Sequence, residues 1–394
     1  MNPWLTLIGL GEDGALSPAA AARLAQAALV VGGARHLALI GPTRAQRLVW
    51  PTPLQDAFPA ILARAGNRVC VLASGDPFFF GVGSLLAGLV GEFESFPQPS
   101  AFSLAASRLG WALQDCALVS LHGRPLEAII PHLQPRARLL ALSWDGETPG
   151  RLAALLTARG LGESRLTVLE AMGGARERRF CALAQEFDAQ GIDALNTIAL
   201  EVAGAGQRIP PRAPGLPDEW FETDGQMTKR EMRALTISAL APRPGETLWD
   251  VGAGSGSICV EWLLADPATA AFAVERQAER CARIRANARA LGVPRLNLVE
   301  GEAPAALGGL PAPDAVFVGG GVEGVVAPCW AALKPGGRLV VNAVTVESQA
   351  AVSSLSAQYG GELLHAQFAR AAPVGRFRGF RAAMPVVQWR AVKS

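Results

Sequence analysis

A proline- and glycine-rich segment near the middle of the chain constrains the fold more than any other feature. Residues 204–219, GAGQRIPPRAPGLPDE, contain four prolines and three glycines. Proline lacks the amide hydrogen and fixes φ, so neither a helix nor a central strand can continue through this stretch. The sequence therefore predicts a linker between two domains, residues 1–203 and 220–394, each of a size that can bury its own core.

Both halves alternate short apolar runs with helical stretches, which is the pattern of βα units in parallel sheets. Two apolar segments near the end, 362–370 and 382–390, are predicted to be antiparallel strands at a sheet edge. The other predicted strands are 5–11, 28–33, 68–76, 116–123, 138–145 and 165–172 in the first half, and 246–254, 269–276, 296–303, 314–321 and 337–344 in the second.

Composition and charge exclude several classes of protein. Half of the residues are hydrophobic, 18% are charged, and the formal net charge is only +2, which argues against nucleic-acid binding as the main task. The apolar runs are interrupted before the ~20 residues that a membrane span requires, and the N-terminus has no signal-peptide pattern. We expect a cytoplasmic protein without membrane or nucleic-acid partners. The scattered cysteines and histidines predict no metal site.

The second half contains a glycine loop, WDVGAGSG at 249–256, between an apolar strand and an apolar helix. Its spacing lacks the third glycine of a dinucleotide fingerprint, where Ser257 stands instead. Asp250 would repel a pyrophosphate but attract the ammonium group of an amino acid. The loop therefore favours S-adenosylmethionine over NAD. The cofactor contacts that we predict from it are Gly252, Ala253, Gly254, Ser255 and Gly256.

Acidic residues follow the next two predicted strands of the second half. Glu275 can accept hydrogen bonds from both ribose hydroxyls, and Glu302, with Ala303 beside it, can meet the adenine amino group. A run of three glycines ends the fourth strand, and its Gly319 and Gly320 leave room for a bulky planar substrate. The same glycines would also suit a simple tight turn.

These features resemble the class I, Rossmann-like methyltransferases. The tetrad Asn/Asp-Pro-Pro-aromatic is missing after the fourth strand, which argues against methylation of base or amide nitrogens. The segment 224–233, DGQMTKREMR, together with DVGAGSG, resembles the carbon-15 methylating, decarboxylating subunit of corrin biosynthesis. That resemblance implies Thr228 as a cofactor contact.

The residues of this segment also allow a structural interpretation, in which Thr228 caps a helix and Glu231 completes a capping box. Both interpretations can hold at once. Protonation of the macrocycle would assist decarboxylation, and Glu231 and Arg233 are the candidate catalytic residues for it.

The first half contains three ordered motifs: a glycine turn in LIGLGEDG (7–14), SGDPFFFG (74–81) and PSAFSLAASRLG (99–110). Their order resembles the tetrapyrrole methylase family, also called class III methyltransferases, over residues 7–202. The resemblance implies two α/β lobes, about 1–112 and 113–203, that hold S-adenosylmethionine between them. It implies cofactor contacts from Gly75, Asp76, Pro77, Phe79, Ser103, Leu104 and Leu142, with Gly9 and Gly11 facing the tetrapyrrole.

Some of these residues have structural alternatives. Asp76 can be a turn former that bonds its own backbone, and the phenylalanine run can belong to the core. Arg176, Arg178 and Arg179 can hold substrate carboxylates or form a solvated basic hairpin. The chain has 33 arginines and 3 lysines, which suits a polycarboxylate substrate and equally a GC-rich genome.

Taken together, the two resemblances imply a fused enzyme of cobalamin biosynthesis. It would be a two-lobed tetrapyrrole methylase followed by a doubly wound class I domain, with one S-adenosylmethionine site in each half. The implied reactions are methylation of a precorrin at carbons 5 and 15 and decarboxylation of the acetate on carbon 12. We expect a homo-oligomer.

Two alternatives remain open for the whole chain. One is an RNA or other small-molecule methyltransferase with a class I domain, which the balanced charge disfavours for RNA. The other is a chain in which one half is a non-catalytic module, which the glycine loops of both halves disfavour.

Overall fold

The computed structural model describes residues 3–394, which form two compact units. One unit covers residues up to Leu126 together with His132–Gln207, and the other covers Glu127–Pro131 and Arg208–Ser394. The division at residue 207 falls within the proline-rich segment. No helix among the described residues has the length and apolar character needed to cross a membrane.

The proline-rich segment is bound at both ends rather than free. The amide of Gln207 donates to the carbonyl of Arg159 at 2.8 Å in the first unit. The amide of Gly215 donates to the carboxylate of Glu261 at 2.7 Å in the second unit, and Leu216 is only 1% exposed there. A sequence that excludes helix and strand can therefore still pack as an ordered, irregular segment, because a backbone carbonyl and a carboxylate accept from its amides.

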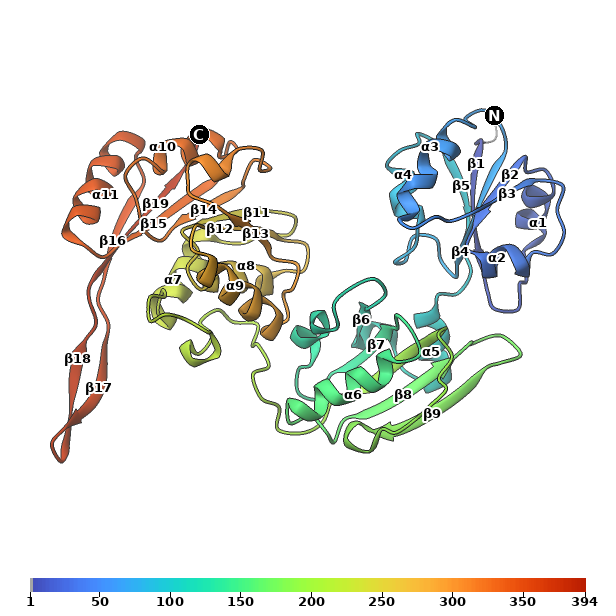
Figure 1. Cartoon of the computed structure of the whole chain (residues 1–394), viewed down its shortest axis with the longest axis horizontal. Helices are drawn as coiled ribbons and strands as arrows, with labels where there is room; N and C mark the ends of the chain where they lie inside the picture. The colour runs from blue at the N-terminus through green and yellow to red at the C-terminus, as the bar shows by residue number, and fades with distance from the viewer. Residues whose placement is uncertain (1–2) are drawn as a thin grey trace. The chain divides into compact units, whose positions relative to one another are not determined.

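The first lobe of the first unit is a five-stranded parallel sheet in the order β3-β2-β4-β1-β5 (Figure 1). The inner strands are continuous apolar runs because helices cover a parallel sheet on both faces. The strands are β1 (Leu5–Leu10), β2 (Leu29–Gly32), β3 (Gln46–Val49), β4 (Val69–Ser74) and β5 (Phe93–Phe96), and the helices are α1 (Pro18–Ala25), α2 (Ala34–Leu39), α3 (Phe58–Leu62) and α4 (Gly83–Ala87).

The second lobe is a mixed sheet in the order β6-β7-β10-β8-β9, whereas the βα pattern of the sequence indicated parallel strands. Only β6 and β7 run parallel. The seven residues between β8 and β9 are too few for a parallel crossover, which needs a dozen or more. The strands are β6 (Cys116–Ser120), β7 (Arg138–Leu142), β8 (Arg165–Glu170), β9 (Arg178–Leu183) and β10 (Asn196–Glu201), with helix α6 (Thr148–Ala158).

Helix α5 (Ala101–Leu109) packs on the sheet of the second lobe. Its Phe102 and Ala106 share a core cluster with Leu140 of β7 and Ala199 of β10. By packing, the second lobe therefore begins near residue 100, earlier than the expected boundary near 113.

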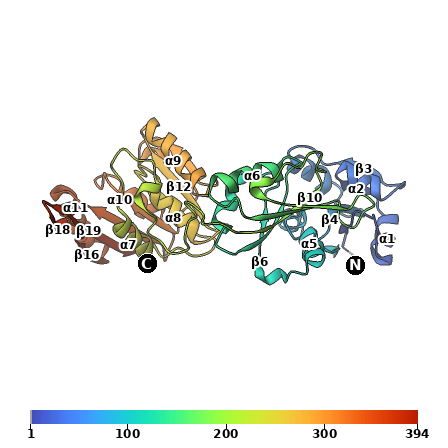
Figure 2. The same ribbon diagram turned by 90° about the horizontal axis from the view of Figure 1, so that it is seen from below.

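The second unit contains a seven-stranded sheet in the order β13-β12-β11-β14-β15-β19-β16. Five strands are parallel, and β19 and β16 form the antiparallel edge, which confirms the prediction for the two C-terminal segments. Helices α8 and α9 pack against β12 and against each other (Figure 2). The strands are β11 (Thr247–Val251), β12 (Ala270–Glu275), β13 (Asn297–Glu300), β14 (Ala315–Val318), β15 (Arg338–Ala343), β16 (Glu362–Ala366) and β19 (Val386–Val392), and the helices are α7 (Arg230–Leu240), α8 (Ser257–Ala265), α9 (Ala278–Ala290), α10 (Val326–Ala332) and α11 (Val346–Tyr359).

A separate hairpin of β17 (Ala369–Val374) and β18 (Phe377–Ala382) extends beyond the edge of this sheet (Figure 1). Its apolar side chains are exposed, with Phe377 at 68% and Phe380 at 82%. Sequence patterning did not reveal this hairpin, because neither of its faces packs on a core.

Candidate active sites

In the first unit, a cavity lies where the two lobes meet. It is formed by loops after β1 and β4, by the starts of α2 and α5, by the end of β8 and by the start of β10. The residues that line it are Leu10, Gly11, Glu12, Arg35, Ser74, Gly75, Pro99, Ala101, Leu104, Leu169, Ala171, Met172, Leu195, Asn196 and Thr197.

Two glycines allow the chain to pack tightly beneath this cavity. Gly75 has a φ of +55°, and a Cβ there would approach the carbonyl oxygen of Pro99 to 2.8 Å. A Cβ on Gly9 would overlap the carbonyl oxygen of Gly75. Gly9 is therefore a packing residue of β1, and its contact with the substrate stays a prediction.

The structure places the other predicted residues of the first half at different distances from the cavity. Gly11, Gly75 and Leu104 line it. Asp76 forms the turn that the sequence also allows, because its carboxylate accepts from the amide of Phe78 at 2.8 Å.

The four remaining predicted contacts lie outside the residues that line the cavity. Pro77 is buried in the turn of Asp76, and Ser103 forms a hydrogen bond with Ser100 at the start of α5. Phe79 packs edge-on against Phe102, and Leu142 packs on the core of the second lobe.

Sequence reasoning missed most of the second lobe's contribution to the cavity. Asn196 is 7% exposed, and its amide nitrogen donates to the carbonyls of Asp145 and Asp193 at 3.1 and 2.8 Å. Its Oδ1 atom is buried and has no partner. An unsatisfied buried acceptor is costly unless a ligand supplies a donor. The predicted strand at 165–172 ends at Ala171 and Met172, so the sequence could have indicated these two residues as part of a ligand site. The sequence did not predict β10, so it gave no indication of Asn196.

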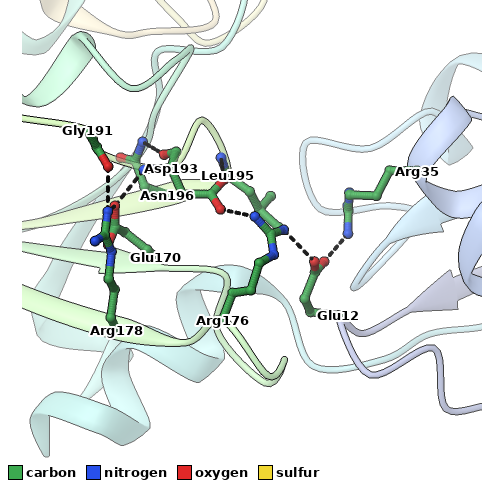
Figure 3. Close-up of polar contacts among 9 residues, drawn as sticks. All are labelled: Glu12, Arg35, Glu170, Arg176, Arg178, Gly191, Asp193, Leu195 and Asn196. Carbon is green, nitrogen blue, oxygen red and sulfur yellow. Dashed lines mark hydrogen bonds and ion pairs between the residues drawn. The ribbon is translucent and has the colours of Figure 1, made fainter.

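Charged side chains from both lobes meet at one edge of this cavity (Figure 3). The carboxylate of Glu12 accepts from Arg35 and also from Arg176, the latter at 3.2 Å. Arg176 also pairs with Asp193. A second pair, Glu170 with Arg178, lies next to this group and anchors the amide of Asp193.

In the second unit, the glycine loop follows β11 and presents open space to a ligand. Gly252, Gly254 and Gly256 have φ values of +74°, +60° and +73°. A Cβ on Gly252 would meet no atom within 4 Å, and one on Gly254 would meet none closer than 3.8 Å. Gly256 instead packs on Ile284, where a Cβ would come to 3.1 Å. The first two glycines thus form a cradle that a side chain would fill.

Asp250, in β11 below the loop, is 1% exposed, and neither of its carboxylate oxygens has a partner in hydrogen-bond geometry. Burial raises its pKa to about 7, the nearby charge of Glu275 adds to this, and the neighbouring thiol and amide of Cys259 offset only part of the shift. The hydroxyl of Ser255 is also buried without a partner. These unsatisfied acceptors fit the cationic, hydrogen-bond-rich end of S-adenosylmethionine.

Glu275, at the end of β12, is 4% exposed and lies against the glycine loop. Its Oε2 atom accepts from the amide of Gly254 at 2.9 Å, and its Oε1 atom accepts from the amide of Gln277 at 3.0 Å. A carboxylate has about four acceptor sites, so two remain for ribose hydroxyls. Glu302, by contrast, is 69% exposed and pairs with Arg276 at 2.8 Å, while Ala303 is half-buried beside it.

The segment 224–233 lies beside the glycine loop, because the carbonyl of Gln226 is the atom nearest to the Cβ position of Gly254. Arg280 of α9 holds this segment through Asp224 at 2.7 Å and Gln226 at 2.9 Å. The predicted capping box is wrong: α7 begins at Arg230, and its N-cap, Lys229, makes no side-chain cap bond.

Both candidate catalytic residues are engaged in other contacts, and their catalytic role stays a prediction. Arg233 has no exposed surface, and its guanidinium donates to Glu261 at 2.5 Å, to Asp218 at 3.1 Å and to the carbonyl of Thr228 at 2.7 Å. It is therefore a positioning residue that holds the Thr228 segment.

The carboxylate of Glu231 has a pKa lower than usual. Burial alone would raise this pKa, but hydrogen bonds from its own backbone amide and from Arg370 outweigh the effect of burial. The group is therefore ionised at neutral pH.

Gly319 and Gly320 follow β14, the strand next to β11. A Cβ on Gly319 would lie 3.1 Å from the ring of Phe317 and 3.9 Å from the carbonyl of Gly252, whereas one on Gly320 would meet no atom within 4 Å. The structure thus brings these two glycines to the edge of the cradle. Among residues 3–394, no group of three or more His, Cys, Asp or Glu side chains is arranged to hold a metal ion.

Comparison with known proteins assigns both units. Residues 5–188 match the family Tetrapyrrole (Corrin/Porphyrin) Methylases, and residues 219–393 match the Precorrin methyltransferase domain. A protein of Sinorhizobium sp. named precorrin-6Y C(5,15)-methyltransferase (decarboxylating) is 54% identical over 99% of this chain and 96% of its own length. A protein of the same name from Mycobacterium tuberculosis is 41% identical over 99% of this chain and 100% of its own length.

A crystal structure of the C-terminal domain of precorrin-6Y C5,15-methyltransferase from Rhodobacter capsulatus is 47% identical to the matched part. It covers 47% of this chain and 100% of that chain, with a TM-score of 0.45.

The fold and the two matched families define a methyltransferase built from a tetrapyrrole methylase domain and a second, precorrin methyltransferase domain. The chain belongs to the family of precorrin-6Y C5,15-methyltransferases (decarboxylating). It is therefore an enzyme that transfers methyl groups from S-adenosylmethionine to carbon, and this family assignment favours a precorrin over RNA as its substrate.

Proposed function

We propose that each half carries its own S-adenosylmethionine site and its own methylation. The first half would methylate carbon 5 of the precorrin, and the second would methylate carbon 15 and release carbon dioxide from the acetate on carbon 12. The observation that carries this proposal is the pair of separate sites. One is the cavity lined by Gly75 and Leu104, and the other is the open cradle above Asp250.

In the second half, the residues of the chain bind and orient the reactants. When bound, S-adenosylmethionine supplies a methyl group already activated on a sulfonium, so the protein contributes mainly position. Asp250 and Ser255 would accept hydrogen bonds from the amino-acid end, directly or through water, and Glu275 would accept from the ribose. Correct placement of two reactants contributes roughly 7–11 kcal/mol to the lowering of a barrier.

The edge of the cradle is the proposed place of the macrocycle in this half. Gly320 leaves open the space that a side chain would otherwise occupy, and Gly319 lets the chain pass close to the ring of Phe317. Thr228, held by Arg233, would contact the cofactor from the opposite segment. Glu302 and Ala303 remain proposed contacts of the adenine, and Glu302 would have to leave Arg276 to reach it.

In the first half, the backbone of Gly75 and the side chain of Leu104 would hold the cofactor, with Gly11 on the substrate side. Asn196 would add an acceptor for an amino group such as that of adenine, because its Oδ1 atom is buried and unpaired. Asp76 and Pro77 would act through the turn that they build.

Titration calorimetry of the full chain with S-adenosylmethionine tests the proposal of two sites. The expected stoichiometry is two, with two affinities that respond to separate substitutions. A stoichiometry of one that persists in the presence of the precorrin would contradict it.

We further infer that the chain forms a homo-oligomer through the β17–β18 hairpin. A two-stranded ribbon without a hydrophobic partner is marginal in water. This hairpin exposes Val374, Phe377 and Phe380, so a second copy of the same hairpin is the proposed partner. Light scattering should give more than one chain per particle, and the double substitution Phe377→Ser and Phe380→Ser should reduce that number to one. A monomeric wild-type chain would exclude the proposal.

A further inference from the structure

The ion pairs at the edge of the first cavity have the chemistry of a carboxylate-binding site. Glu12 follows β1 in the first lobe, and its side chain is 10% exposed. One arginine of each lobe donates to it: Arg35 at the start of α2, and Arg176 in the connection between β8 and β9. Two guanidinium groups that converge on one carboxylate form a strong and directional anion site (Figure 3).

The chain is shaped to bring these groups together. A Cβ on Gly174 would collide with Cγ of Glu12, so only glycine at this position lets the β8–β9 connection approach so closely. Glu12 itself lies in a turn closed by a bond from the amide of Gly14 to the carbonyl of Gly11 at 3.2 Å. Its neighbour Asp13 is exposed, so solvent is within reach of the Glu12 side chain if it rotates.

Both arginines would keep their places without Glu12. Arg35 also donates to the hydroxyl of Ser74 at 2.9 Å and contacts Nε2 of His36 at 3.0 Å. Arg176 remains paired with Asp193, whose amide is in turn held by Glu170 at 2.5 Å. The withdrawal of Glu12 would therefore leave an organised site with one positive charge in excess.

We propose that Arg35 and Arg176 bind an acetate or propionate carboxylate of the macrocyclic substrate, and that Glu12 occupies this site until the substrate displaces it. The inference rests on the proposed function, because a precorrin carries such side chains. Exchange of one carboxylate for another preserves the hydrogen bonds of both arginines, so little desolvation opposes it. The site adjoins the cavity lined by Gly75, which would bring the ring of the substrate next to the methyl donor.

Substitutions at Glu12 and Arg176 should act in opposite directions. Glu12→Gln removes the competing charge, so the KM for the precorrin in carbon-5 methylation should fall at least threefold while kcat stays near wild type. Arg176→Gln removes a donor to the substrate, so KM should rise about tenfold, which corresponds to about 1.4 kcal/mol. Arg176→Lys should recover part of this loss. The double substitution should resemble Arg176→Gln.

If the ion pairs of Glu12 only hold the two lobes together, a different result is expected. In that case Glu12→Gln and Arg176→Gln would both weaken activity and both lower the melting temperature by similar amounts, and this result would overturn the proposal. Arg108→Gln is the matched control. It removes another arginine–glutamate pair, in which Arg108 of α5 donates to Glu177 of the same connection at 2.6 Å, but it does not touch Glu12. Its KM should equal that of the wild type.

Binding of a stable porphyrin polycarboxylic acid, followed by its fluorescence, separates this inference from the proposed function. Glu12→Gln should tighten binding and Arg176→Gln should weaken it even if no methyl transfer occurs. The wild type could turn over the precorrin while the two variants show no opposite change in binding. That result would agree with the proposed function and exclude the carboxylate site.

Discussion

At the scale of single residues, the buried carboxyl of Asp250 links the stability of the second unit to its ligand site. Its pKa of about 7 lies well above the ~3.9 of an exposed aspartate. The folded state therefore binds more protons than the unfolded state between about pH 4 and pH 7. The stability that this group contributes is fully present below pH 4 and is lost as the pH rises through 7.

The variant Asp250→Asn should remove this dependence. Without cofactor, the variant should melt at a higher temperature than the wild type, and this difference should be larger at pH 8 than at pH 5. Each unit of pKa shift corresponds to about 1.4 kcal/mol of stability. Its affinity for S-adenosylmethionine in the second unit should fall at pH 8, because the charge that attracts the ammonium group is gone. Thermal melts at both pH values and calorimetry at pH 8 measure the two effects. Parallel pH profiles for both proteins would exclude the buried charge as their cause.

Glu275 and Glu302 provide a matched pair of carboxylates. Glu275→Ala should lower cofactor affinity at least tenfold, because two charge-assisted bonds worth about 1.5–3 kcal/mol each are removed together with the anchor of Gly254. Glu302→Ala should change affinity less than threefold, because the proposed contact of this exposed side chain with the adenine would only replace its existing pair with Arg276. Equal losses in calorimetry would show that cofactor binding needs both residues, and unchanged affinity in both variants would remove Glu275 from the ribose site.

The residues also show what a sequence can and cannot predict. The position of Glu275 beside the glycine loop could be predicted because a strand ends there, and the ends of parallel strands share one edge. The complete burial of Arg233 could not, because MTKREMR is a polar stretch and nothing within it indicates burial. Its partner Glu261 was the available signal, since it is a lone charge in the otherwise apolar helix SICVEWLLA.

At the scale of elements, Arg233 and Glu261 join α7, α8 and the proline-rich segment. Arg233→Met should destabilise the second unit by roughly 3–5 kcal/mol, because Glu261 is left charged and buried. Circular dichroism during thermal unfolding measures this loss. The double variant Arg233→Met and Glu261→Gln removes both charges, so it should recover part of the stability; no recovery would mean that packing, and not charge, dominates.

Predictability differed between elements for physical reasons. The glycine loops and the central strands have local signatures, because burial on both faces forces continuous apolar runs. The edge strands β3 and β5 are short and partly exposed, and the hairpin β17–β18 contacts solvent on both faces. No hydrophobic period therefore marks them. The antiparallel return of β10 depends on loop lengths across the second lobe, which no local pattern encodes.

At the scale of the whole molecule, the proposed division of labour requires that either site can be blocked alone. Gly254→Arg suits the second unit. The Cβ position there is open, so the main cost is the positive φ, about 1–2 kcal/mol. The equivalent change at Gly75 would collide with Pro99 and disturb the fold of the first unit. Leu104→Trp, which fills the cavity from α5, is the better counterpart.

Each variant should lose one set of products. Gly254→Arg should lose carbon-15 methylation and carbon dioxide release and retain one methylation. Leu104→Trp should give a decarboxylated product with a single new methyl group. Product masses after incubation with S-adenosylmethionine and the precorrin measure both outcomes, once circular dichroism has shown that each variant is folded. Both reactions of the second half need the macrocycle at the cradle of Gly254. Decarboxylation that continues in Gly254→Arg would therefore assign carbon dioxide release to the first half and refute the proposed division.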